Sequence, residues 1–177
     1  MKGDEKVIDY LNKALTNELT AINQYWLHYR VLDNWGVFKL AAYERKESIE
    51  EMEHADWLAD RILFLDGLPN FQALHKLKVG ESVKEVLEAD LALEMEAIPL
   101  LREAADYCQQ VKDFTSGQLF EKILRNEEEH VDFLEKQFDM IVRMGEQNYI
   151  QLQSAAAGEE GNEGGAWGLG GGDGNGN

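Results

Sequence analysis

The sequence predicts an all-α domain in which four long helices form a bundle, with one long crossover and a short fifth helix at the C-terminal end. Apolar residues recur at helical spacing in four long stretches, and almost nothing shows the period-two alternation of a half-buried strand. A chain of 177 residues, 44% of them hydrophobic, is long enough for one domain with a full core but not comfortably for two. We therefore expect a single folded domain.

The first pair of helices is separated by a short break. The first helix is predicted from about Glu5 to Asp33 and ends at Asn34-Trp35-Gly36. The second begins near Phe38 and stops at Asp66. The segment from Gly67 to Glu81 contains two glycines and a proline and is longer than the usual link between antiparallel neighbours. It predicts a crossover that runs along the bundle.

The second pair begins with a capping signal. Ser82-Val83-Lys84-Glu85 has the capping-box pattern and opens a third helix, which runs to about Lys112 and which Pro99 is expected to bend. A fourth helix runs from near Phe114 to Met144. Gly145 suits a helix C-cap, after which residues 146–157 form a short fifth helix. Because a bundle with short loops only would need no crossover, the order of elements predicts the ferritin-like kind of four-helix bundle.

The last twenty residues differ in composition from the rest. Ten of residues 158–177 are glycine, four are acidic and none is basic. Such a segment cannot bury enough apolar area to offset its ordering entropy. We expect a helical domain over residues 1–157 and a Gly-rich, acidic, disordered tail over residues 158–177.

The charge and cysteine content exclude several classes of function. Acidic residues outnumber basic ones by 34 to 17, and a net charge of −17 repels phosphate and anionic lipid while attracting cations. We expect no nucleic-acid or membrane partner. The N-terminus has no apolar signal segment, so a soluble, cytoplasmic protein is expected. Cys108 is the only cysteine, so any metal must be held by carboxylates and imidazoles.

Each predicted core stripe is interrupted by ionisable residues. Glu18 interrupts the first stripe and Glu94 the third, while the second and fourth each carry a Glu-x-x-His pair. Residues three apart share a helix face, so each pair aims at one point. The six residues are Glu18, Glu51, His54, Glu94, Glu127 and His130. Six unpaired ionisable groups in an apolar core would each cost several kcal/mol, so a cation is expected among them.

The six residues form an internal repeat. Glu18 lies 33 residues before Glu51, Glu94 lies 33 residues before Glu127, and the two sets are offset by 76 residues. Two helix pairs related by a pseudo-two-fold axis would place the six groups symmetrically. Four carboxylates and two imidazoles in that arrangement suit two iron or manganese ions bridged by shared carboxylates.

Other polar residues have simpler interpretations. A single Glu-x-x-His is usually a solvated face or a salt bridge, but two of them with equally spaced partner glutamates indicate a metal site. Tyr25, two turns beyond Glu18, is a candidate catalytic residue. The alternative interpretation is that it is an ordinary aromatic residue of the core. His28 and His75 lack a ligand constellation and are interpreted as ordinary polar residues. The neighbours of the candidate ligands in the acidic runs are expected to be solvated: Glu50, Glu53, Glu128 and Glu129.

The sequence resembles the bacterioferritins over residues 1 to about 155. The segments that carry the resemblance are Met1-Lys2-Gly3-Asp4, Asn17-Glu18-Leu19, Ala21-Ile22-Asn23-Gln24-Tyr25, Glu47-Ser48-Ile49, Arg61-Ile62-Leu63-Phe64-Leu65, Gly67-Leu68-Pro69-Asn70, Asp90-Leu91-Ala92-Leu93-Glu94 and Gln147-Asn148-Tyr149. The resemblance implies that Glu18 and Glu94 are terminal iron ligands, that Glu51 and Glu127 are bridges, and that His54 and His130 are the imidazole ligands. It also implies that Met52 binds a b-type haem between two subunits. Met52 is the point at which the repeat fails, with Glu128 opposite it, and it lies off the metal face of its helix.

The resemblance also implies an activity. A member of this family would oxidise Fe(II) with dioxygen or hydrogen peroxide at the di-iron centre and deposit ferric mineral inside a homo-oligomeric shell of twenty-four subunits. The haem would assist iron release, with a small ferredoxin as electron donor. The centre could be either a stable cofactor or a transit site.

Two positions depart from the family pattern. Lys46 stands where many members have a histidine of an accessory inner-surface iron site, together with an acidic residue that matches Glu50, and a protonated lysine cannot be a ligand. Phe133 replaces a more usual tryptophan.

Four rival classes fit the sequence less well. A di-iron oxygenase usually needs a larger chain for its substrate cavity. A rubrerythrin needs cysteine pairs, and a DNA-binding miniferritin needs a basic tail. A purely structural bundle would have to tolerate six buried ionisable groups without metal.

Overall fold

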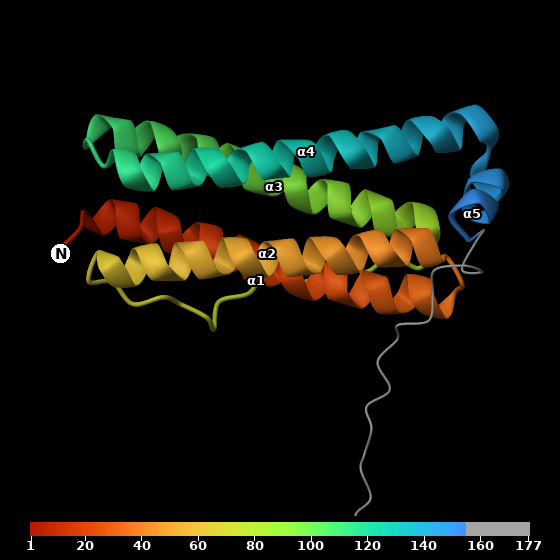
Figure 1. Cartoon of the computed structure of the whole chain (residues 1–177), viewed down its shortest axis with the longest axis horizontal. Helices are drawn as coiled ribbons and strands as arrows, with labels where there is room; N and C mark the ends of the chain where they lie inside the picture. Colours follow the sequence, from red (N-terminus) through yellow and green to blue (C-terminus); the bar gives the residue numbers. More distant parts are fainter. Residues whose placement is uncertain (155–177) are drawn as a thin grey trace, which may run out of the picture.

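The computed structural model describes residues 1–154, and in that part the chain is all-helical, as predicted (Figure 1). The helices are α1 (Glu5–Asn34), α2 (Phe38–Phe64), α3 (Val83–Gln110), α4 (Phe114–Met144) and α5 (Glu146–Ser154). Each lies where the sequence predicted a helix. The expected extension of the fifth helix to residue 157, and the tail over residues 158–177, lie outside the described residues.

The helix ends follow the capping residues of the sequence. Asp4 accepts the backbone N–H groups of Lys6 and Val7 at the start of α1, and Ser82 accepts the N–H of Glu85 at the start of α3. The predicted end of the third helix at about Lys112 is two residues too late, because Lys112 has a positive φ of 62° that does not continue a right-handed helix. The helix continues unbroken through Pro99.

The helices pack as two antiparallel pairs. Figure 1 shows α1 beside α2 and α3 beside α4, and the short α5 turns back across one end of the bundle. Tyr149 of α5 is fully buried there, and its hydroxyl donates to the side-chain oxygen of Gln137 at 3.0 Å. Hydrogen bonding of this kind is what a buried tyrosine requires. The fifth helix therefore closes the bundle at this end.

The crossover between α2 and α3 lies along α1, as its length predicted. Its backbone N–H groups donate to side chains of α1 in chain order: Asn70 to Asn12, His75 to Thr20, Lys78 to Gln24 and Gly80 to His28. The last three acceptors stand one helical turn apart on one face of α1. A segment without secondary structure thus satisfies part of its backbone with side chains of one helix.

The apolar core is divided into two main parts along the bundle. One part joins the start of α1 to the end of α3 and includes Leu11, Leu58, Leu101 and Phe120, all at most 1% exposed. The other joins the end of α1 to the start of α3 and includes Leu32, Leu40, Leu87 and Leu134. Buried polar residues occupy the middle of the bundle between these parts. The four-helix frame therefore holds a polar interior in a fixed position.

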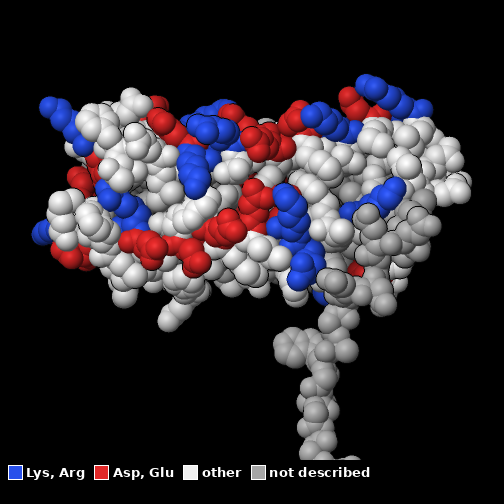
Figure 2. Space-filling view, viewed as in Figure 1, with Lys and Arg blue, Asp and Glu red and all other residues white. Residues whose placement is uncertain are grey.

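The surface is charged on the face that Figure 2 shows. Lys and Arg side chains are interspersed there with Asp and Glu rather than gathered into one basic surface. Among the residues that the structure describes, no helix has both the length and the apolar character needed to cross a bilayer.

Candidate dimetal centre

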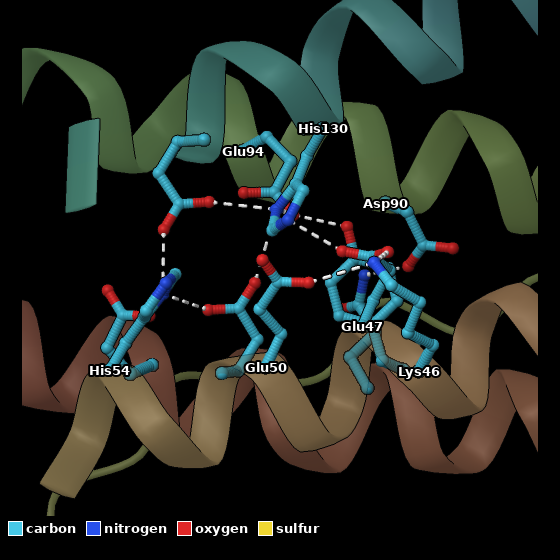
Figure 3. A network of polar contacts seen from close by, with 12 residues as sticks. Lys46, Glu47, Glu50, His54, Asp90, Glu94 and His130 are labelled. Carbon is cyan, nitrogen blue, oxygen red and sulfur yellow. Dashed lines mark hydrogen bonds and ion pairs between the residues drawn. The ribbon is translucent and has the colours of Figure 1, made fainter. Parts of the chain in front are cut away.

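The six residues that the sequence singled out lie together in the interior of the bundle. Figure 3 labels three of them, His54, Glu94 and His130. The most exposed of them, His130, is only 5% exposed. They come from all four long helices: Glu18 from α1, Glu51 and His54 from α2, Glu94 from α3, and Glu127 and His130 from α4. The predicted convergence is therefore present, and the role of these residues as ligands stays a prediction.

The six residues form two overlapping groups. Glu18, Glu51, His54 and Glu127 make one group, and Glu51, Glu94, Glu127 and His130 make the other. In each group the potential ligand atoms all lie within 4.8 Å of one another. Because Glu51 and Glu127 belong to both groups, each has the position of a bridge between two metal ions.

The contacts of the two imidazoles show the same pseudo-symmetry. His54 Nδ1 lies 2.9 Å from Glu51 Oε2, 3.3 Å from Glu18 Oε2 and 3.5 Å from Glu127 Oε1. His130 Nδ1 lies 3.1 Å from Glu127 Oε2, 3.3 Å from Glu51 Oε1 and 3.6 Å from Glu94 Oε1. Each imidazole therefore directs Nδ1 toward three carboxylates, two of which are shared.

The ionisation of the group reflects this crowding. Burial, with the charges of Glu127 and Glu51, raises the pKa of Glu18, and burial with the charge of Glu127 raises the pKa of Glu94. Burial lowers the pKa of His54, but the carboxylates of Glu127, Glu18 and Glu51 outweigh it and raise the pKa to about 12. The pKa of His130 is raised for the same reason.

The central carboxylate behaves in the opposite way. Burial acts to raise the pKa of Glu51, but its contacts with His130 and His54 lower the pKa below the ordinary range. Positive charge on the two imidazoles would therefore stabilise these carboxylates. Divalent cations bound at the two groups would take over that function.

Tyr25 lies directly against the candidate centre. Its side chain is fully buried, and its hydroxyl donates a hydrogen bond to Glu94 Oε1. Burial, with the charge of Glu94, raises the pKa of this phenol. Tyr25 therefore remains a proton donor that orients one candidate terminal ligand.

Met52 does not belong to the buried centre. Its side chain is 42% exposed, on a face of α2 that also carries the partly exposed Ile49. An exposed thioether on a helix can act as an axial ligand to haem iron brought by a second surface.

Several buried polar residues were missed by the interpretation of the sequence. His28 was interpreted as a polar residue without a ligand constellation, which is wrong: it is fully buried, its Nδ1 lies 2.8 Å from Asp90 Oδ1, and it forms a candidate metal-binding group with Glu44 and Asp90. Glu44 and Glu47 are also buried, and both side-chain oxygens of Glu44 lack a hydrogen-bond partner within the described part of the chain. Their spacing relative to Glu51, at seven and four residues before it, places them on the same helix face and could have revealed them.

The expectation of solvated acidic neighbours is confirmed at three of four positions. Glu53, Glu128 and Glu129 are exposed. Glu50 is only partly exposed and forms an ion pair with Lys46 at 2.9 Å. His75 is exposed on the crossover, where its Nε2 lies 3.1 Å from Asn17 Oδ1, in agreement with its interpretation as an ordinary polar residue.

A cavity of about 200 Å³ reaches the candidate centre from the crossover side. Its inner wall includes Glu18, Glu51, Glu94 and Glu127. Its outer wall includes the crossover residues His75, Lys76 and Lys78. The cavity therefore reaches four of the six candidate residues from outside the bundle.

A helical bundle with two overlapping carboxylate–imidazole groups defines the class of protein. A model of the ferritin-like domain family matches residues 8–144, which places the chain in that class. A bacterioferritin of Brucella melitensis biotype 1 is 52% identical over 159 residues, covering 90% of this chain and 99% of the relative. Bacterioferritins of Rhodobacter capsulatus (53% over 155 residues, 88% and 96% covered) and Streptomyces coelicolor (51% over 150 residues, 85% and 90% covered) are similar to the chain as well. The chain belongs to the bacterioferritin family.

Proposed function

We propose that the protein stores iron, and that it oxidises Fe(II) to Fe(III) at the six residues of the candidate centre before the ferric ion is deposited as mineral. The observation that carries the proposal is the pair of buried groups that share Glu51 and Glu127. Ferrous ion is a substrate that carboxylates and imidazoles bind. The relatives named above are bacterioferritins, which supports a role in iron storage.

The membership of the residues in the two groups supports a role for each of them. Glu51 and Glu127 would bridge the two ions, Glu18 and Glu94 would be terminal ligands, and His54 and His130 would complete the two positions. Two adjacent ferrous ions supply two electrons together, so one dioxygen is reduced to hydrogen peroxide, or one hydrogen peroxide to two waters, with uptake of two protons. Either oxidant satisfies this balance. Tyr25 holds Glu94 in place through its hydroxyl.

The remaining parts of the proposal concern assembly and release. A storage protein needs an enclosed volume, and we infer a closed shell of twenty-four copies in the cytoplasm. Haem fits Met52 because its thioether is exposed on the outside of α2, where a second copy could supply the matching ligand. A bound haem would carry electrons inward for reductive iron release, with a small ferredoxin as donor.

The oxidation site is tested by Glu127→Ala and His130→Ala. Both variants should still assemble, because the apolar stripes are intact, but rapid Fe(II) oxidation followed by stopped-flow absorbance should be lost. Glu128→Gln is the control, since Glu128 is exposed and pairs with Arg102 at the surface. Unchanged oxidation kinetics in both alanine variants would contradict the assignment of the centre.

Storage itself is tested by particle size and iron content. Gel filtration should give a very large particle, and the purified protein should take up far more than two iron ions per chain. A small oligomer that saturates at two ions per chain would instead indicate a di-iron enzyme without a store.

A further inference from the structure

The two imidazoles of the candidate centre differ on the side that faces away from it. His130 Nε2 lies 2.6 Å from Glu47 Oε2, an ion-pair contact (Figure 3). His54 Nε2 is buried and has no hydrogen-bond partner within residues 1–154. The pseudo-symmetry of the Nδ1 contacts therefore does not extend to Nε2.

Glu47 is held in place from both directions. Its side chain is 1% exposed, and its second oxygen, Oε1, lies 3.1 Å from the ammonium of Lys46. A polar side chain this deeply buried needs such partners to offset its loss of contact with water. His130, Glu47 and Lys46 thus form a chain of charged contacts that leads from the centre toward the surface.

The internal repeat explains why His54 lacks such a partner. Glu47 stands four residues before Glu51, and the residue four before Glu127 is Ile123. Ile123 is fully buried in the apolar core. The second half of the repeat therefore has an apolar side chain where the first half has a carboxylate.

We propose that Glu47 is a positioning residue for His130, and that it makes the metal position at His130 bind a divalent cation more tightly than the position at His54. An imidazole that binds a metal ion through Nδ1 carries its hydrogen on Nε2. A carboxylate that accepts a hydrogen bond from this N–H fixes the orientation of the ring and makes Nδ1 a more basic metal ligand. Glu47 Oε2 lies 2.6 Å from His130 Nε2, an ion-pair contact that is not aligned as a hydrogen bond in the structure and that a small rotation of the ring would align, whereas His54 Nε2 has no hydrogen-bond partner within residues 1–154. The proposal rests on the proposed function, because it requires the dimetal centre.

The test is an anaerobic titration of the metal-free protein with Co(II), followed by visible absorption and calorimetry. The wild-type protein should bind two ions per chain in distinguishable steps. Glu47→Gln keeps the shape but removes the charge, and Glu47→Leu removes the acceptor as well. Either variant should weaken the tighter step by about 10–100-fold and leave the weaker step within about twofold. Glu128→Gln, which removes one charge from an exposed residue, should leave both steps unchanged.

The outcomes separate this proposal from the one on which it depends. Two steps of equal affinity in the wild-type protein, unchanged binding in both Glu47 variants, or an equal loss at both steps would each overturn the role of Glu47 while leaving the dimetal centre in place. A wild-type protein that binds fewer than two ions would overturn the dimetal centre as well.

Discussion

The α1–α2 pair and the α3–α4 pair each contribute two glutamates and one histidine to the candidate centre, yet the residues around these side chains differ. Glu18, Glu51 and His54 of the first pair correspond to Glu94, Glu127 and His130 of the second. Next to these residues, Glu47 corresponds to Ile123 and Met52 to Glu128.

The comparison separates the positions at which the two halves agree from those at which they differ. The two halves agree where their side chains meet on the pseudo-two-fold axis, as the proposed pair of ions with shared bridges would require. They differ at positions where the surroundings of the two halves differ. Met52, on the exposed surface of α2, is one such position. The repeated residues therefore form the candidate centre itself. The residues that depart from the repeat form its surroundings, which differ between the two halves.

The largest effect is expected from a substitution at Met52, where the two halves differ. Met52→Leu should abolish haem binding while Fe(II) oxidation continues, because the thioether is lost and the buried centre is untouched. Iron release under reducing conditions should become slow. The matched change at the repeat position, Glu128→Leu, should leave the haem spectrum unchanged. A low-spin haem spectrum of normal intensity in Met52→Leu would show that the ligand lies elsewhere.

A second effect tests whether the two apolar parts of the core contribute equally. Leu58 and Leu134 occupy equivalent positions in the repeat, and both are fully buried. Either leucine-to-alanine change should lower the free energy of unfolding by about 2–5 kcal/mol, measured by denaturant titration, because each leaves a cavity. Val142→Ala, at a residue that is 84% exposed, should change it by less than about 0.5 kcal/mol. A loss confined to one leucine would mean that one half dominates the stability.

A smaller effect concerns the dependence of stability on pH. The pKa values of Glu18 and Glu94 are raised above the ordinary value of 4.5, so the folded, metal-free protein binds protons that the unfolded chain releases. The resulting stability is fully present below pH 4.5 and is lost as the pH rises toward the folded pKa.

Glu18→Gln and Glu94→Gln should each make this loss shallower between pH 5 and 8, by at most about 1.4 kcal/mol per pH unit, the effect of one proton. Thermal unfolding of the metal-free variants over that range would measure the change. A steeper loss of stability in either variant would contradict the directions given for these carboxyl groups.

The smallest effect is expected from removing residues 158–177, which belong to neither half of the repeat. Truncation after Ala157 should leave particle size and the rate of Fe(II) oxidation unchanged, because a segment so rich in glycine buries little apolar area. Slower oxidation or failed assembly would show that residues 158–177 have a structural role.

The sequence was sufficient for the helices and for the six centre residues because both follow from spacing. Apolar periodicity locates a helix, and two Glu-x-x-His pairs with equally spaced partners leave few alternatives. Spacing places Glu44 and Glu47 on the helix face of Glu51, but it does not show that they are buried, and it gives no such signal for His28 and Asp90. A carboxylate on a helix is solvated by default, and its burial depends on how far the polar interior extends along the bundle, which only the packed structure shows.

The contacts between the crossover and α1 have a consequence for evolution and engineering. Connections without secondary structure usually tolerate insertions and deletions. Here Thr20, Gln24 and His28 stand at fixed spacing on α1, and each accepts one backbone N–H from a successive part of the crossover. One residue inserted into α1 between Thr20 and Gln24 would rotate the later acceptors by about 100° away from their donors. This irregular segment should therefore be as intolerant of length changes as the helices that it connects.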